Sequence, residues 1–184
     1  MNEVELIRGH LTLERQHAAE VARACAGALA AAGSQGIQRR ASLEAFLQAG
    51  VEYLVWMLSR FEEREQVFHD LLRGRFPTED PNRRAVEAAL ALPGTSREAL
   101  AKLETALGTT VDSDWTDFLR FFSGAWSARR DEIDRLFERQ AKVADWRTVS
   151  DIDADSIVDE RSRYARVKAT LPAGIEMSPA ASHL

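Results

Sequence analysis

The sequence predicts an all-α protein, an antiparallel four-helix bundle followed by a short fifth helix. Apolar residues recur at helical spacing over long stretches, and most prolines and glycines fall between those stretches. No apolar run alternates with polar residues in the manner of a strand. The chain has 184 residues, 45% of them hydrophobic and 29% charged, which suits one folded core. We therefore expect a helical domain over residues 1–171 and a flexible tail over residues 172–184.

The two longest predicted helices come first. Residues 3–31 keep a helical period until a glycine-containing stretch interrupts it. A second helix is expected over residues 42–73, with Ser42 as its N-cap. Residues 74–82 contain two prolines and are expected to form a loop.

Three further helices complete the prediction. One is expected over residues 83–107, with a break at Pro93, and another over residues 113–143. A polar link rich in aspartate then leads to the short last helix, which runs through Ile157 and Val167.

Several polar residues fall on the predicted apolar faces when each residue is rotated by about 100° from the one before. His10, Glu14 and His17 lie on the apolar face of the first helix. On the second helix Glu65 lies near the middle of that face, Glu62 and His69 lie at its edge, and Glu63 points away. On the helix over 113–143, Arg129 lies near the middle and Glu132 at the flank. The interior of the bundle is thus expected to contain both carboxylates and a cation.

Burying ionised groups costs several kcal/mol each unless they are paired or bind a metal, so this interior needs a compensating partner. In one interpretation, residues from the first two helices surround one or two transition-metal ions. These residues are His10, Glu14, His17, Glu62, Glu65 and His69. In the other, Arg129 donates forked hydrogen bonds to Glu14 or Glu65, and no metal is bound.

Two stretches resemble the hemerythrin-like cation-binding family of four-helix bundles, which hold a non-haem di-iron centre. The first stretch has Glu52-Tyr53-Leu54, Arg60-Phe61-Glu62-Glu63 and Val67-Phe68. The second has Leu136-Phe137, then Ala144-Asp145-Trp146-Arg147-Thr148-Val149, then residues 161–171. The resemblance implies the bundle fold, and non-haem iron or another divalent transition metal as the cofactor if one is bound. It also implies that Glu132 matches the family's carboxylate on the fourth helix.

The sequence departs from the family pattern at the ligand positions. Glu62-Glu63 stand where the family has a His pair, and Ser127 or Ala128 occupies the expected histidine position on the fourth helix. Residues 81–143 contain no histidine. A family-type oxygen-binding centre is therefore not expected, and a carboxylate-rich metal site or a metal-free Arg–Glu network remain the two alternatives.

The functional expectations follow from these alternatives. The chain either senses or handles iron, oxygen or a related redox species, or it is a regulatory or interaction module whose Trp56, Trp115 or Tyr164 contacts a protein partner or a second copy. An enzymatic role is less expected, because di-iron oxidases repeat Glu-x-x-His and only Glu14 and His17 have that spacing.

The partner and the compartment are predicted from charge and hydropathy. A net charge of −5 without a basic segment argues against nucleic acid as a partner. The acidic N-terminal segment is not of the secretory type, and no apolar run approaches the roughly 18 residues needed to span a membrane. The single cysteine, Cys25, is expected to be a buried apolar residue. We therefore expect a soluble, cytoplasmic protein.

Overall fold

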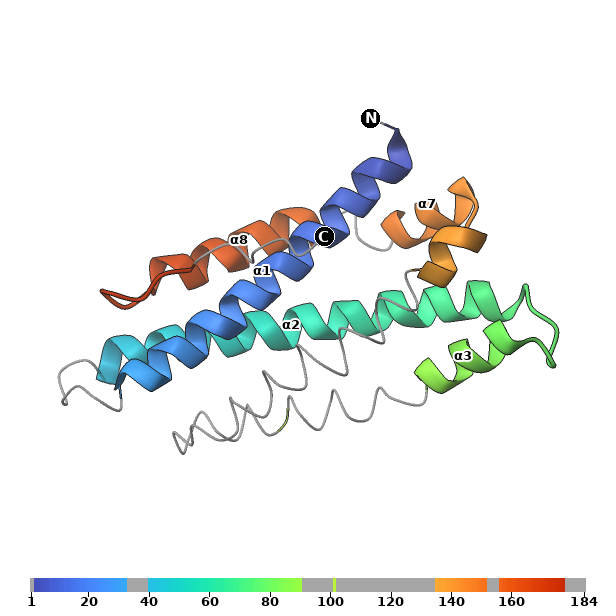
Figure 1. The fold of residues 1–184 in the computed structure, drawn as a ribbon. Coiled ribbons are helices and arrows are strands. Elements are labelled where there is room, and N and C mark those ends of the chain that lie inside the picture. The colour runs from blue at the N-terminus through green and yellow to red at the C-terminus, as the bar shows by residue number, and fades with distance from the viewer. Residues whose placement is uncertain (1, 33–39, 91–100, 102–134, 152–155, 178–184) are drawn as a thin grey trace.

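A computed structural model describes residues 2–32, 40–90, 101, 135–151 and 156–177 (Figure 1). Within these ranges the backbone forms helices, turns and short connections, and no strand, so the predicted all-α class is confirmed. None of the described helices combines the length and the apolar character needed to cross a membrane. The predicted break at Pro93, together with Trp115, Arg129 and Glu132, lies outside the described residues.

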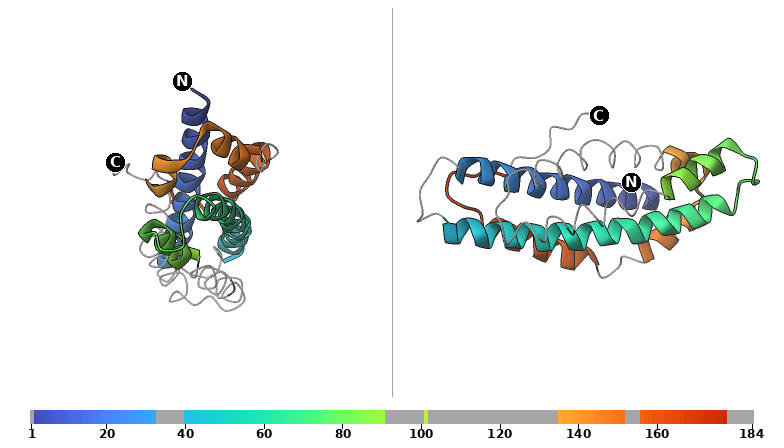
Figure 2. Two further views of the ribbon diagram at one scale, coloured as in Figure 1. Left: turned by 90° about the vertical axis from the view of Figure 1, so that its right-hand side faces the viewer. Right: turned by 90° about the horizontal axis from the view of Figure 1, so that it is seen from below.

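The bounds of the first two helices agree with the predicted ones to within two residues. α1 spans Glu3–Ala32 and α2 spans Arg40–Arg73, and the two run antiparallel along most of their lengths (Figures 1 and 2). Ser42 is not the N-cap, because α2 begins two residues before it. A serine N-cap is worth only about 1 kcal/mol, which the good helix formers Arg40 and Ala41 offset.

The next helix, α3, spans Pro81–Leu90 and begins two residues earlier than predicted. The Asp80 carboxylate accepts a hydrogen bond from the Asn82 backbone N–H at 2.8 Å, which makes Asp80 the N-cap. Pro81 then occupies the first helical position, where its fixed φ favours the helix and its missing N–H costs nothing. The proline therefore starts this helix rather than belonging to the loop.

The end of the long helix predicted over residues 113–143 differs from the structure. Residues 135–140 are helical, residues 141 and 142 are not, and a separate helix, α7, spans Val143–Asp151. The Asp145 carboxylate accepts a hydrogen bond from the Lys142 backbone N–H at 2.6 Å and so caps the new helix. It also pairs with Arg75, which lies two residues after the end of α2. This side-chain capping gives α7 its own start, which the apolar period alone did not reveal.

The short last helix is confirmed as α8, Ser156–Ala169, which lies against α2 and α1. The predicted domain boundary falls just after it. Beyond that boundary Gly174 adopts a left-handed φ of 85°, and Ile175 and Met177 are half-buried against the larger core. The first part of the predicted tail therefore packs on the bundle.

The buried side chains form two cores. The larger lies between α1, α2 and α8, around Phe46, Leu54 and Phe61. The smaller lies where the N-terminal half of α1 meets the end of α2, α3, residues 135–140 and α7. Its centre is an aromatic group in which the Phe137 ring lies 4.1 Å from Phe68 and 4.7 Å from Trp146, centroid to centroid.

Gly50 sets the distance between α1 and α2. A Cβ at this position would lie 2.5 Å from the Sγ of Cys25 and 3.5 Å from Val21. Cys25 is fully buried, as predicted, and burial raises the pKa of its thiol. The missing side chain thus lets the two helices approach closely at Cys25 and Val21.

Gly50→Ala is expected to destabilise the protein by about 1–2 kcal/mol, because the clash with Cys25 outweighs the better helix propensity of alanine. Adding Cys25→Ala should restore most of the loss, as measured by urea unfolding. Gly9→Ala is the matched control, because nothing lies within 4 Å of its added Cβ, and it should stabilise slightly. Equal effects of the Gly50 and Gly9 variants would contradict the close approach.

Candidate functional site

A buried ion pair joins α1 to α2 in the interior of the protein. Glu14 and Arg64 are both fully buried. Arg64 Nη1 donates a hydrogen bond to Glu14 Oε2, and Nη2 donates to Oε1 at 3.2 Å. This is the forked geometry in which a guanidinium satisfies both oxygens of a carboxylate. The ring centre of Phe61 lies 5.8 Å from the guanidinium carbon of Arg64.

His10 lies on the exposed side of this ion pair. Its Nε2 is 3.0 Å from Glu14 Oε1, close enough for an ion pair but not aligned for a regular hydrogen bond. Burial alone would raise the pKa of Glu14, but His10 and Arg64 outweigh it and lower the pKa to about 2. Glu14 is therefore a carboxylate at any physiological pH.

A second polar group joins all three of α1, α2 and α8 around Glu160, which is 1% exposed. Tyr53 of α2 donates its hydroxyl hydrogen to Glu160 Oε1 at 2.8 Å. Nδ1 of His17, from α1, lies 2.9 Å from the same oxygen. One carboxylate oxygen thus holds a side chain from each of the other two helices.

Tyr164 extends this group toward the C-terminal end of α1. Its hydroxyl donates to the carboxylate of Glu20, and its ring stacks on the His17 imidazole with centroids 3.8 Å apart. Burial, followed by the hydrogen bond to Glu20, raises the pKa of Tyr164. Burial and the nearby Glu160 carboxylate raise the pKa of Tyr53 in the same way. Both hydroxyls therefore stay protonated and act as donors.

The structure separates the residues that were predicted to share one site. Glu14, Glu65 and His69 are buried, and Glu63 is exposed, as the facing of α2 predicted. His10 and Glu14 lie together, whereas His17 belongs to the Glu160 group. Glu62 is half-buried. Tyr164 was expected to present an exposed edge and is instead buried, because α8 packs its ring between His17 and the core.

The fit of a metal ion can be judged from the donor atoms. Both oxygens of Glu14 are engaged by Arg64, so a metal at this carboxylate would have to displace a buried guanidinium. The donor set around Glu160 consists of one carboxylate, one imidazole and a tyrosine held protonated. Among the described residues, no three His, Cys, Asp or Glu side chains gather as a metal-binding group. The arrangement fits a hydrogen-bonded network better than a di-iron centre.

Arg64 is the central residue that the sequence analysis missed. The predicted face of α2 was drawn through leucines and phenylalanines such as Leu54 and Phe61, and Arg64 lies roughly 80° from the middle of that face. Tyr53, which binds Glu160 of α8, and Met57 are also buried on this second side. The signal was present in the sequence, because Met57, Phe61, Arg64 and Phe68 follow one another at helical spacing. Glu160 had no comparable signal.

No family model, curated protein or solved structure matches this chain. The resemblance to the hemerythrin-like family therefore stays a prediction from the sequence.

Proposed function

We propose that the chain is a metal-free antiparallel four-helix bundle that serves as a regulatory or interaction module. The observation that carries this proposal is the forked ion pair between Arg64 and Glu14. A buried carboxylate in a bundle needs a positive partner, and Arg64 supplies it in place of a metal ion. Arg129, which lies outside the described residues, is not needed for this role at Glu14.

The network has a structural role that suits such a module. Glu160 of α8 binds Tyr53 of α2 and His17 of α1, and Tyr164 of α8 binds Glu20 of α1. Because polar partners must match in position, these bonds fix the register of α8 on the other two helices in a way that apolar packing alone would not. A bundle of this kind presents fixed surfaces and holds this polar network inside.

An aromatic surface between α2 and α8 supports an interaction role. Trp56 is half-buried, and the guanidinium carbons of Arg163 and Arg60 lie 4.9 Å and 5.5 Å from its ring centre. Arg163 is itself paired with Asp159 at 3.1 Å. Tryptophan and arginine are the residues that most often dominate binding energy at protein interfaces. We propose this surface as the contact for a protein partner.

The second candidate function, a carboxylate-rich iron site, draws on α2. Glu62, Glu65 and His69 lie within two turns of α2, and the last two are buried. With Glu14 held by Arg64, such a site would need further ligands from residues outside the described ranges, of which Glu132 is the predicted one. If it formed, iron or another divalent transition metal would supply the redox chemistry.

Two measurements test the proposal together. Protein purified without added metal is expected to contain far less than one metal ion per chain, and a strong chelator should leave its melting temperature unchanged. Near-stoichiometric iron, with a sharp fall in melting temperature on chelation, would favour the metal site instead.

For the interaction role, a partner retained by the wild type should be lost with Trp56→Ala and kept with the control Arg161→Ala. Retention by both variants would place the contact elsewhere.

A further inference from the structure

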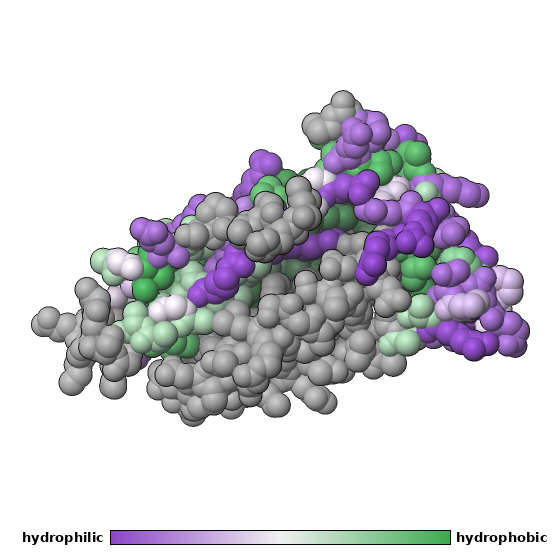
Figure 3. All heavy atoms as spheres, viewed as in Figure 1, coloured by the Kyte–Doolittle hydropathy of each residue, from purple (hydrophilic) through white to green (hydrophobic). Residues whose placement is uncertain are grey.

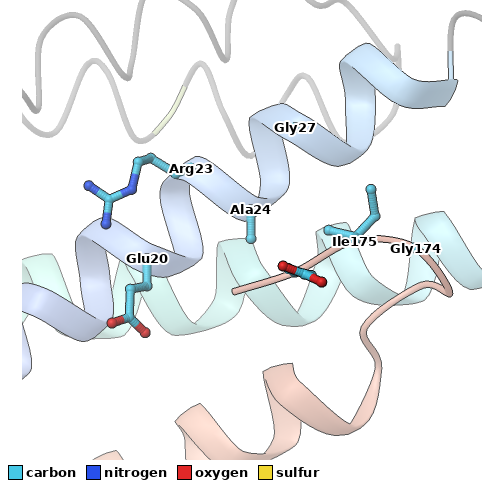
Figure 4. A pocket seen from close by; sticks show the side chains of 7 residues that line it. Glu20, Arg23, Ala24, Gly27, Gly174 and Ile175 are labelled. Atoms are coloured by element: carbon cyan, nitrogen blue, oxygen red, sulfur yellow. The ribbon is translucent and has the colours of Figure 1, made fainter. Parts of the chain in front are cut away.

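A pocket lies between α1 and the segment that follows α8 (Figure 4). Its volume is about 270 Å³. The α1 side is formed by residues at helical spacing, Glu20, Arg23, Ala24 and Gly27, and the other side by Gly174, Ile175 and Glu176. No atom of the described part of the chain lies within 4 Å of a Cβ placed on Gly27 or on Gly174, so the two glycines leave the pocket open at both walls.

The polar network of the bundle reaches this pocket at Glu20. The Glu20 carboxylate is 8% exposed, and among the contacts of the described residues only its Oε2 is engaged, by the Tyr164 hydroxyl. Oε1 is therefore a hydrogen-bond acceptor on the wall of the pocket. Because Tyr164 is fixed by its stacking on His17, the carboxylate is held in place before any ligand arrives.

The charge of the pocket favours a cation. Glu20 and Glu176 contribute two carboxylates and Arg23 one guanidinium. In Figure 4, Glu20 and Ala24 leave α1 toward the C-terminal segment, whereas Arg23 leaves it on the opposite side. The positive group therefore lies at the rim, and the interior combines negative charge with the apolar side chains of Ala24 and Ile175.

We propose that this pocket binds a primary ammonium or guanidinium group carried on a short aliphatic chain. Glu20 accepts hydrogen bonds from the cation, Glu176 adds charge, and Ala24 and Ile175 contact the methylene groups. The pocket is small compared with the roughly 300–1,000 Å³ of sites for drug-sized ligands, so it suits a group of a few heavy atoms. A free alkylamine and a lysine side chain share this chemistry. The inference does not depend on whether the bundle interior holds a metal.

The test is a titration of the full chain, labelled with 15N, with n-butylammonium chloride at constant ionic strength. We expect saturable shifts of the Gly27 and Gly174 amide resonances with butylammonium and none with sodium butanoate. Equal responses to both ions, or shifts with butylammonium that grow without saturation, would overturn the proposal. A parallel titration with the Nα-acetyl amide of lysine distinguishes the sources, because tighter binding than butylammonium indicates a peptide side chain and weaker binding indicates a free amine.

Variants make the test specific to the pocket. Glu20→Gln keeps an acceptor for Tyr164 but removes the charge, and it should weaken butylammonium binding about tenfold or more. Glu176→Gln, at an exposed residue, should weaken it in the same direction. Gly27→Leu should fill the pocket and abolish binding. Gly9→Leu is the matched control on the same helix, again with open space around its Cβ, and should bind like the wild type. Unchanged binding in both Glu20→Gln and Gly27→Leu would refute the site.

Discussion

Arg64→Met is expected to destabilise the protein by about 3–5 kcal/mol at neutral pH, measured as the free energy of unfolding in urea. Methionine can fill the space of the aliphatic part of Arg64, so loss of packing is a small contribution. The large contribution comes from Glu14, which is fully buried and, among the described residues, would keep only the half-buried His10 as a partner. An ionised carboxylate left in this position carries its desolvation cost without compensation.

A double variant separates the charge from the packing. Glu14→Gln together with Arg64→Met leaves no buried ion of the pair, so it should be more stable than Arg64→Met alone by about 2 kcal/mol or more. Arg147→Met is the surface control, because its ion pair with Glu3 is largely exposed and should contribute little. If Arg64→Met lost less than about 1 kcal/mol, Arg64 would not be the counter-charge of the buried Glu14 carboxylate.

The ion pair also predicts the acid sensitivity of the wild type. The pKa of Glu14 is lowered to about 2 in the folded protein, against about 4.3 in an unfolded chain. A lowered pKa contributes stability that is fully present above the unfolded value and is lost as the pH falls from about 4.3 toward 2. In Arg64→Met the lone buried carboxylate favours its protonated form, so its pKa lies above the unfolded value. The variant therefore loses its destabilisation as the pH falls toward about 4.3, and the difference between the two proteins should begin to shrink above that pH and continue to shrink toward about pH 2.

Most of the fold could be predicted because α1 and α2 are long and periodic. A repeat over roughly 30 residues fixes which face is buried even when individual residues are ambiguous. The shorter elements depend on single side chains. α3 starts where Asp80 caps and Pro81 fits, and α7 starts where Asp145 bonds to the Lys142 N–H. These local bonds decide boundaries that an apolar period cannot locate.

The site was less predictable for a physical reason. The position of a residue around a single helix shows whether it points inward. This position correctly predicted that Glu14, Glu65 and His69 are buried. It cannot show which helix covers a second side. Arg64 is buried where it meets Glu14 of α1, and Glu160 becomes an acceptor because Tyr53 and His17 meet it from other helices. Which side chains pair in a buried network depends on how the helices pack together.

Exposed ion pairs and a buried core both lie at the end of the molecule where α1 begins. Hydrophilic side chains gather where the N-terminal end of α1 meets α7 (Figure 3), and there Arg147 binds Glu3 at 2.7 Å while Arg8 pairs with Glu138. Exposed ion pairs of this kind contribute at most about 1 kcal/mol each. The attachment of this end must therefore come mainly from the smaller core beneath, around Phe137.

Phe137→Ala is accordingly expected to cost about 3–5 kcal/mol of unfolding free energy. Phe137 is fully buried between Phe68 of α2 and Trp146 of α7, so its removal leaves a cavity that the rigid helices can only partly close. Urea unfolding followed by circular dichroism at 222 nm measures the loss. Near-ultraviolet circular dichroism should also weaken, because the tilted aromatic group loses its central ring.

Val143→Ala provides the comparison for Phe137→Ala, since Val143 lies at the start of α7 with a 51% exposed side chain. Its effect should stay within about 0.5 kcal/mol. If Phe137→Ala cost no more than this control, the side chain could not lie in a packed core. A large loss that appeared as a separate early transition, with the main transition unchanged, would mean instead that the smaller core unfolds independently of the Arg64 region. A single cooperative transition is expected, because α1 and α2 run through both cores and the smaller one cannot open without exposing Leu11 and Leu72 of these two helices.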